Sequence, residues 1–581
     1  MRCRQQRALF REINGESAPR GSILRNVSNG SVRGGASQAL LLAVMVALAA
    51  LIAFLVVAQP ANREHDVLIP RHLETPKFEP PPALKPAGET LAQVWADLKG
   101  RTGTAFLQRV LPTQSGALWI ALIVALAVGL DTAALRNPRN LDLIALLVIG
   151  FILFDVMRFF ELLTDPIYFR VMDWVFIGVV ATSVWLAARA GWRVWRPITT
   201  PWQPNLPTRA LVLLTFVLLS LNVLVVLVRL PDDAGFYTNL GGQRLRERGM
   251  FPYGDPLITG SPAAAYGPVL FLAHVPFQWL LDPDPVNPDA TDQPIDQQPK
   301  PYTLPPPLAS QLATLTFHLL AVGALVVSAR RLAGDQVAWA LAALYCGSAY
   351  VIGVGGSAEM VGGLTFISHT AAPALALLAF ACLANPLLAG VFLALSVATV
   401  FYPMFFVPAW IGFYSRTRGA AWRFVLGMGL AALVVGGPVL ARSRPIEGHG
   451  LVGTIVTETL GHHQGASTYG LTPFSFWGRR EGVRAWFQHE LIQGQAASTP
   501  MFLVAAILAA LAFLPARRAT PQQLALLSGA SAILVNVWKI LGTGVYVTWY
   551  YPFLLLGFFA YGRPPSREPV MPSSPDVPLS V

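Results

Sequence analysis

Residues 208–256 read TRALVLLTFVLLSLNVLVVLVRLPDDAGFYTNLGGQRLRERGMFPYGDP, an apolar run followed at once by a polar one. The apolar part, 208–230, is long enough to cross a bilayer as a helix, because about 20 residues span the hydrocarbon core. The polar part is rich in charged side chains: Asp232, Asp233, Arg244, Arg246 and Arg248. This pattern predicts a membrane helix with a charged segment at its end.

The whole chain is too apolar for a soluble protein of its length. It has 581 residues, of which 54% are hydrophobic and 13% are charged. Apolar runs of about 18 residues or more recur, and such runs must be helical because lipid offers no partner to backbone polar groups. We therefore expect an all-α polytopic membrane protein, with about 12 spans, a broken helical hairpin and an interfacial helix.

The net charge of +11 fits a membrane protein better than a nucleic-acid binder. The basic residues recur in short loops between apolar runs, as the positive-inside rule expects of cytoplasmic loops. No basic and aromatic patch on a soluble domain accompanies them, so no nucleic-acid partner is expected. This pattern predicts a multi-pass protein of the cell membrane with both termini in the cytoplasm.

The apolar runs and their flanking charges give the predicted organisation. Four segments are expected: a cytoplasmic basic tail (1–37), an N-terminal four-helix membrane module (38–200), a larger membrane domain (201–562) and a disordered cytoplasmic tail (563–581). The predicted spans are 38–58, 117–134, 141–157, 171–189, 208–230, 308–329, 336–354, 365–384, 421–441, 500–515, 522–541 and 546–562. The long loops would then all lie on the external face.

Two apolar segments do not fit simple spans. Residues 266–281 are short and contain Pro268 and Pro276, and counting them as a span would place Arg331 outside. We therefore expect an interfacial or re-entrant helix on the external side. Residues 386–413 form two short apolar halves around VFYPMFFVP, which predicts a broken hairpin with both ends cytoplasmic.

The adjacent carboxylates Asp232 and Asp233 allow two interpretations. An Asp near the start of a following helix is often only a solvated cap. A carboxylate beside apolar surface and a second carboxylate instead gains proton affinity, which suits a general base acting on a hydroxyl.

Other polar residues are equally open to two interpretations. The arginines of RLRER (244–248) suit either a helix face on lipid headgroups or a phosphate site. The loop 442–499, which contains His462, His463 and Arg479, is either an ordinary loop or a sugar or phosphate site. Lys539 either extends to the membrane interface or contacts a lipid-borne phosphate. His318 and His369 are either functional or merely bonded to a neighbour. Three cysteines and the absence of a metal-ligand spacing predict no metal and no cofactor.

The chain from about 201 to 581 resembles the GT-C membrane glycosyltransferases, and most closely glycosyltransferase family 87. The resemblance rests on an apolar helix followed by Asp233, Tyr237, a Gly241/Gly242 turn, Pro252-Tyr253 and AYGPVLFLAHVP. LLAGVFLALSVATVFYPMFFVPAWIGFYSRTRG (387–419) is similar to the family's broken hairpin, and TWYYPFLLLGF to its closing helix. Phe401 and Tyr402 stand where the family often has a Lys, and the module 1–200 has no counterpart in it.

The resemblance implies an inverting sugar transfer from a polyprenyl-phosphate donor to a lipid-linked, glycan or protein acceptor. It assigns the base to Asp233 rather than Asp232, and phosphate stabilisation to arginines. The expected substrate-binding residues are Tyr237, Arg244, Arg248, Tyr253, Tyr266, His462, His463, Arg479 and Lys539. Membrane lipids are expected partners. A transporter or a non-catalytic membrane scaffold is the alternative, although charge in loops on one face and the lack of a visible repeat favour the enzyme.

Overall fold

The described part of the chain is helical, as predicted. The computed structural model describes residues 114–131, 134, 136–147, 166–198, 200–229, 231, 233–255, 265–281, 305–355, 360–361, 363–461, 495–539 and 546–561. Apart from a two-residue ladder of β1 (Val354–Gly355) with β2 (Met360–Val361), the elements in these ranges are helices. The predicted anchor helix 38–58 and both tails lie outside the described residues.

The helices follow the predicted apolar runs closely. They are α5 (Gln114–Val128), α7 (Pro166–Trp195), α8 (Thr208–Val228), α9 (Asp233–Arg248), α10 (Pro268–Leu281), α11 (Pro307–Ala333), α12 (Asp335–Cys346), α13 (Ala349–Ile352), α14 (Ile367–Ala381), α15 (Pro386–Val397), α16 (Val407–Tyr414), α17 (Ala420–Ala441), α18 (Leu451–Val456), α21 (Gln495–Leu511), α22 (Phe513–Ala516), α23 (Pro521–Lys539) and α24 (Val547–Phe559). Residues 138–147 are also helical, η3 (Gly363–Thr365) and η4 (Tyr402–Phe406) are 3-10 helices, and η5 (Thr457–Gly461) is a π-helix.

Three of the described helices, α8, α11 and α17, are long and apolar enough to cross a membrane. Their outer faces are exposed although they are apolar. Leu213 on α8 is 67% exposed, and Val434 on α17 is 71% exposed. Such surface is costly in water and favourable in lipid. Six further apolar helices are shorter, so the expected total of about 12 spans stays a prediction.

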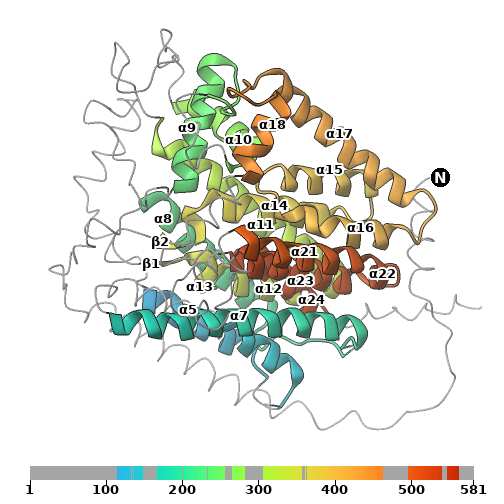
Figure 1. The fold of residues 1–581 in the computed structure, drawn as a ribbon. Helices are drawn as coiled ribbons and strands as arrows, with labels where there is room; N and C mark the ends of the chain where they lie inside the picture. The colour runs from blue at the N-terminus through green and yellow to red at the C-terminus, as the bar shows by residue number, and fades with distance from the viewer. Residues whose placement is uncertain are drawn as a thin grey trace, which may run out of the picture. The chain divides into compact units, whose positions relative to one another are not determined.

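The main hydrophobic cluster of the described residues is shared by helices from both predicted membrane segments. Figure 1 shows α11, α14, α15, α23 and α24 side by side, and α7 packs along α23. Leu146 and Leu186, from the predicted N-terminal module, belong to the same buried cluster as Leu526 and Phe553. The division at residue 200 stays a prediction.

The arginine-bearing turns of the chain meet at one end of the helices, which we call the basic end. Gln523 Nε2 donates to the Val194 carbonyl (2.7 Å), and Arg139 Nη1 donates to the Pro201 carbonyl (3.1 Å). The Arg331 and Arg416 guanidiniums donate to the carbonyls of Ala381 and Ala519. These contacts join turns that are far apart in sequence. The predicted order of inward and outward helices likewise places the arginine-bearing turns at one end of the helices.

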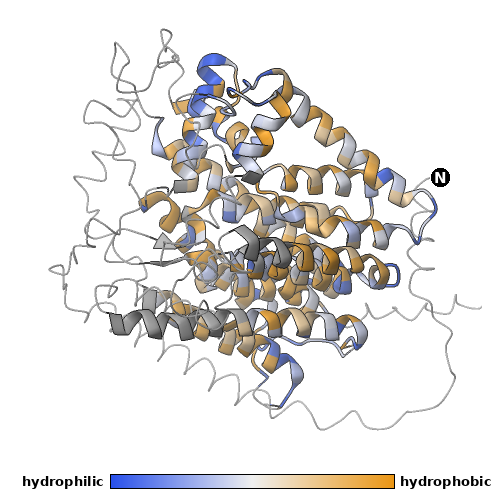
Figure 2. Ribbon diagram, in the orientation of Figure 1, coloured by the Kyte–Doolittle hydropathy of each residue, from blue (hydrophilic) through white to orange (hydrophobic). Residues whose placement is uncertain are grey.

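The opposite end, which we call the loop end, contains α9, α10 and the tip of the broken hairpin. The hairpin has the predicted break, because α15 ends at Val397 and the chain turns through η4 into α16. Its two outer ends adjoin, since the Tyr414 hydroxyl donates to the Leu383 carbonyl (2.9 Å). Figure 2 shows hydrophilic residues on α9 and mostly hydrophobic residues along the long helices.

The short helix α10 lies across the loop end and does not cross the bundle. Gly267 N, beside its first residue, donates to the Thr399 carbonyl at the hairpin tip (2.8 Å). Near its other end, Gln278 Nε2 donates to Asn239 Oδ1 (2.8 Å), and Asn239 Nδ2 donates to the Pro306 carbonyl beside α11 (3.0 Å). Both ends of α10 therefore lie at the same end of the helices.

His318 is bonded to a neighbour within the helices. Its Nε2 lies 3.3 Å from Asn222 Nδ2, which also donates to the Cys346 carbonyl (3.2 Å). Both side chains are fully buried. The pair ties α8 to α11 and to the end of α12, and it favours the structural interpretation of His318.

Glycines allow α15 and α17 to approach each other closely. A Cβ at Gly390 would lie 2.1 Å from the Phe424 carbonyl oxygen, whereas a Cβ at Gly429, on the same pair of helices, would meet nothing within 4 Å. The two positions therefore form a matched pair.

We expect Gly390→Ala to lower the melting temperature in detergent, because separating the two helices costs about 1–3 kcal/mol. Gly429→Ala should cause no loss, since alanine favours the helix by up to about 1 kcal/mol. Equal melting temperatures for the two variants would contradict the close α15–α17 contact.

Candidate functional site

The polar segment after α8 folds into the helix α9, which begins at Asp233 and ends at Arg248. An acidic residue in the first turn and arginines in the last turn both suit the helix dipole. Gly249 ends the helix with a φ of 63°, in the left-handed region that glycine adopts easily. The structure describes Asp233 only as the first residue of this helix, and Asp232 lies outside the described residues.

Gly241 and Gly242 are helical, so the predicted glycine-rich turn is wrong. Both glycines face α10. A Cβ at Gly241 would lie 2.5 Å from the Phe271 ring, and one at Gly242 would lie 2.8 Å from the Phe271 carbonyl oxygen. The pair thus serves close packing of two helices, which needs a missing side chain rather than a positive φ.

Arg244 forms a buried ion pair with Asp255. Its Nε and Nη2 donate to the two carboxylate oxygens at 2.7 and 3.1 Å, and Nη1 lies 3.5 Å from Glu247 Oε2. Arg244 is 1% exposed, so its guanidinium does not lie on lipid headgroups. The arginine ties α9 to the turn that follows it. Its assignment to a donor phosphate stays a prediction. The carboxylates of Asp255 and Glu247 already lie at the guanidinium and would repel a phosphate there.

The segment 251–254 pairs with the chain that leaves α17. Phe251 N donates to the Arg442 carbonyl (2.8 Å), and Arg444 N donates to the Tyr253 carbonyl (3.1 Å). Gly254 has a φ of 73°, and a Cβ there would lie 2.0 Å from the Arg444 carbonyl oxygen. Its N–H donates to Glu458 Oε2 (2.7 Å), so the segment that follows α9 is bound to η5.

Tyr253 and Tyr266, both predicted site residues, are in direct contact. The Tyr253 hydroxyl donates to the Tyr266 carbonyl (2.8 Å), and its ring packs edge-on against Phe271. Burial, and then the charge of Glu458, raise the pKa of Tyr253 well above its usual value. Its phenol therefore stays neutral and acts as a hydrogen-bond donor.

The other predicted residues are placed only in part. Tyr237 is half-buried on α9, where its ring packs edge-on against Phe236. Arg248 is half-buried at the end of α9, and Lys539 is the last residue of α23. His462, His463 and Arg479 lie outside the described residues.

An aromatic cluster, which the sequence did not predict as a site, lines the loop end near the hairpin tip. It consists of His369, Tyr402, Tyr546 and Trp549, from α14, η4 and the start of α24. Tyr402 stacks on Trp549 with ring centroids 4.0 Å apart, and Trp549 packs against Tyr546 at 4.1 Å. The His369 ring packs edge-on against Tyr546.

Two polar atoms of this aromatic cluster are buried without a hydrogen-bond partner in the described part of the chain: Tyr402 Oη and Trp549 Nε1. Such atoms are costly unless a ligand, water or movement satisfies them. The faces of Tyr402 and Trp549 cover each other, so the polar edges of the rings are what a ligand with hydroxyls would contact. The signal available in the sequence was the run VFYPMFFVP (400–408), in which prolines break the helix and aromatic residues, Tyr402 among them, stand beside them.

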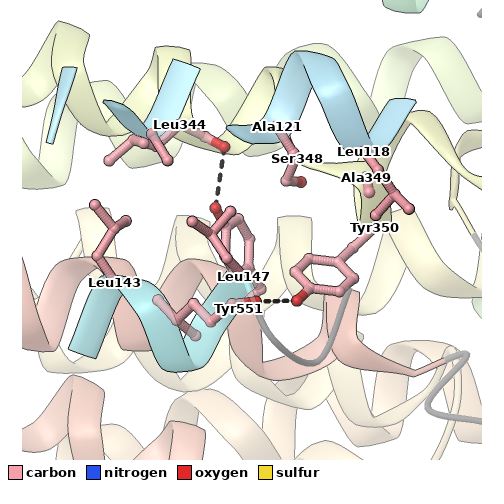
Figure 3. A pocket seen from close by; sticks show the side chains of 11 residues that line it. Leu118, Ala121, Leu143, Leu147, Leu344, Ser348, Ala349, Tyr350 and Tyr551 are labelled. Carbon is pink, nitrogen blue, oxygen red and sulfur yellow. Dashed lines mark hydrogen bonds between the residues drawn. The ribbon is translucent and has the colours of Figure 1, made fainter. Parts of the chain in front are cut away.

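A small cavity elsewhere does not suit a substrate. It lies among α5, helix 138–147, α12 and α24 and has a volume of about 20 Å³, which is room for about one water. Figure 3 shows its mostly apolar lining and the hydroxyls of Tyr350 and Tyr551, which donate to the carbonyls of Leu146 and Leu344. Among the residues that the structure describes, no group of three His, Cys, Asp or Glu side chains could hold a metal ion.

Comparisons of the chain with protein-family models, with curated proteins and with solved structures gave no match. The site must therefore be interpreted from its own residues.

The buried Arg244–Asp255 pair gives a direct stability test. Arg244→Gln should destabilise the protein by about 3–5 kcal/mol, because it leaves the carboxylate of Asp255 buried without its partner. Asp255→Asn should cost less, because Glu247 still lies 3.5 Å from the Arg244 guanidinium. The double variant should lose less than the sum, since the two residues act as one unit. Thermal unfolding in detergent measures all three. Arg246→Gln, which removes a hydrogen bond to the Gln278 carbonyl, is the milder control.

Additive losses from Arg244→Gln and Asp255→Asn would contradict the pairing. The pairing would also be contradicted if Arg244→Gln lowered the thermal stability no more than Arg246→Gln does.

Proposed function

We propose that this chain is an inverting membrane glycosyltransferase of the GT-C type, which uses a polyprenyl-phosphate sugar as donor at the loop end. The observation that carries the proposal is the position of Asp233. It begins α9 directly after the apolar helix α8, and α9 is held at the loop end by α10 and by the segment after α17. A lipid-borne sugar and a polar acceptor would meet at such a boundary.

The chemistry needs a base, a cation and a surface for the sugar. Asp233 would accept the proton of the acceptor hydroxyl, whose oxygen then attacks the anomeric carbon as the bond to the polyprenyl phosphate breaks. Attack opposite the leaving group inverts the configuration. Lys539 is the first candidate for stabilising the leaving phosphate, because carboxylates surround Arg244, and Arg248 lies at the far end of α9 from Asp233.

The aromatic cluster supports a sugar ligand. The edge of a sugar ring carries hydroxyls, which would pair with the two buried polar atoms, Tyr402 Oη and Trp549 Nε1. Gly267 N bonds to the Thr399 carbonyl, so the turn that begins α10 lies against the hairpin tip that carries Tyr402. In this proposal the cluster would hold the donor sugar or the acceptor.

The orientation is part of the proposal. The loop end would face the exterior and the basic end the cytoplasm, with both termini cytoplasmic and the protein multi-pass, because arginines concentrate in cytoplasmic loops. A lipid-linked, glycan or protein acceptor would then be reached from outside the cell.

Cysteine accessibility tests this orientation. In a cysteine-free background, a membrane-impermeant thiol reagent applied to intact cells should label Ala290→Cys, in the loop between α10 and α11. It should not label Arg418→Cys at the basic end until the membrane is permeabilised. Labelling of both positions in intact cells would contradict the orientation.

Asp233→Asn tests the chemistry. The amide keeps the size of the side chain but cannot accept the proton, so sugar transfer should fall by about 10²–10⁴-fold. The assay is transfer from a panel of polyprenyl-phosphate sugars to extracted membrane acceptors. Asp232→Asn, one residue away, is the matched control and should lose much less activity. Unchanged melting temperatures would show that both variants fold.

Full activity in Asp233→Asn would exclude it as the base. If the wild-type protein transfers no sugar from any donor but moves a solute into liposomes, the transporter replaces the enzyme. If it does neither, the scaffold interpretation is favoured.

A further inference from the structure

The basic end contains a buried cluster of charges that sugar transfer does not use. Its centre is Asp142, on helix 138–147, which is fully buried. Arg189 Nε and Arg193 Nη2, both from α7, donate to the two oxygens of this carboxylate at 2.7 and 2.8 Å. The carboxylate thus joins helix 138–147 to α7.

A third guanidinium lies in the same cluster. Arg139 is 4% exposed, and its Nη1 and Nη2 donate to the carbonyls of Pro201 and Thr200. Its guanidinium carbon lies 5.8 Å from the centre of the Tyr561 ring. Burial, opposed in part by Tyr561, lowers the pKa of Arg139 to about 10. Arg139 is therefore still charged at neutral pH.

The cluster has more positive charge than it can neutralise. Asp142 forms ion pairs with Arg189 and Arg193 and acts on Arg139 electrostatically, so in the described part of the chain three guanidiniums lie near this single carboxylate. In addition, the Nε atoms of Arg139 and Arg193 are buried without a hydrogen-bond partner. A buried excess of charge is costly, and an unsatisfied buried donor adds to the cost. Both defects would be corrected by one anion.

The surroundings favour a lipid as the source of this anion. On the same helix, Trp192 and Trp195 are 51% and 79% exposed, and the Arg196 guanidinium lies 5.1 Å from the Trp192 ring centre. Exposed tryptophan beside arginine is typical of the level of lipid headgroups. Basic pockets between helices at the cytoplasmic side of a membrane bind anionic headgroups.

We propose that Arg139, Arg189 and Arg193 bind the phosphate group of an anionic lipid in the leaflet at the basic end. Planar guanidiniums match phosphate oxygens better than a point charge does. The bound phosphate would hold three segments together: helix 138–147, α7 and the connection 200–202 that leads to α8. It would thereby make the packing of the predicted N-terminal module on the rest of the chain depend on lipid composition. This proposal does not depend on sugar transfer.

Lipid retention and thermal stability test the proposal. The full chain, purified in detergent, is mixed with phosphatidylglycerol, cardiolipin or phosphatidylcholine, and separately with inorganic phosphate. Bound lipid is counted by native mass spectrometry and the melting temperature is recorded. The anionic lipids should stay bound and raise the melting temperature, and phosphatidylcholine should do neither.

Two variants locate the site. Arg139→Gln should weaken binding of the anionic lipid at least about tenfold, as removal of a buried charged partner does. Arg418→Gln, which removes an exposed arginine of the basic end that is not part of the cluster, is the matched control and should keep the wild-type affinity. Arg139→Lys keeps the charge but loses the planar donor set, so it should lie between them. If Arg139→Gln does not fold, the test rests on two other readouts: the lipid affinity of Arg139→Lys and the retention of anionic lipid by the wild-type protein.

Equal binding of phosphatidylcholine would overturn the proposal, as would equal losses of lipid affinity in Arg139→Gln and Arg418→Gln. Stabilisation by millimolar phosphate, lost in Arg139→Lys, without any effect of anionic lipid would keep the phosphate site but reject the lipid as its source.

Discussion

A buried ion pair between Arg244 and Asp255 fixes the geometry of the loop end. The two residues are separated by the end of α9 and by a turn, so their contact folds the segment 249–255 back onto the helix. Gly254 in that segment then bonds to Glu458, and Tyr253 bonds to Tyr266. Because these bonds reach α10 and the chain beyond α17, the single ion pair aligns three elements that are distant in sequence. Other contacts add to it, since Asn239 of α9 bonds to Gln278 of α10 and to the Pro306 carbonyl.

The two ends of the helices differ in the sign of the buried charge that is in excess. At the loop end, carboxylates surround Arg244, and the aromatic cluster near the hairpin tip leaves two polar atoms without a partner in the described residues. At the basic end the reverse holds, since three arginines lie near Asp142 in the described residues and two of them pair with its carboxylate. The first arrangement suits the hydroxyls of a sugar or of an acceptor, which pair with polar side chains and with a carboxylate base. The second suits an anion. The sugar-transfer proposal and the lipid proposal therefore rest on different residues.

Much of the fold could be predicted from the sequence, because the length of an apolar run is a local property. The helix predicted at 421–441 is α17 (Ala420–Ala441), and the prolines of 386–413 mark a real break. The site was harder. Gly241 and Gly242 suggested a turn, but their lack of side chains is used for contact with Phe271, which no local pattern reveals. Asp255 and Glu458 were missed because their partners, Arg244 and Gly254, are set by tertiary structure.

The central claim is that the loop end, and not another surface, receives a polyprenyl-phosphate sugar. Photo-crosslinking with a donor analogue that carries a diazirine near the phosphate, followed by peptide mass spectrometry, tests it most directly. The account predicts labelled peptides from 233–255 and from the hairpin tip at 398–406, and competition by unlabelled donor. Labelling confined to the basic end or to the outer faces of α8 and α17, or labelling that unlabelled donor does not reduce, would contradict it.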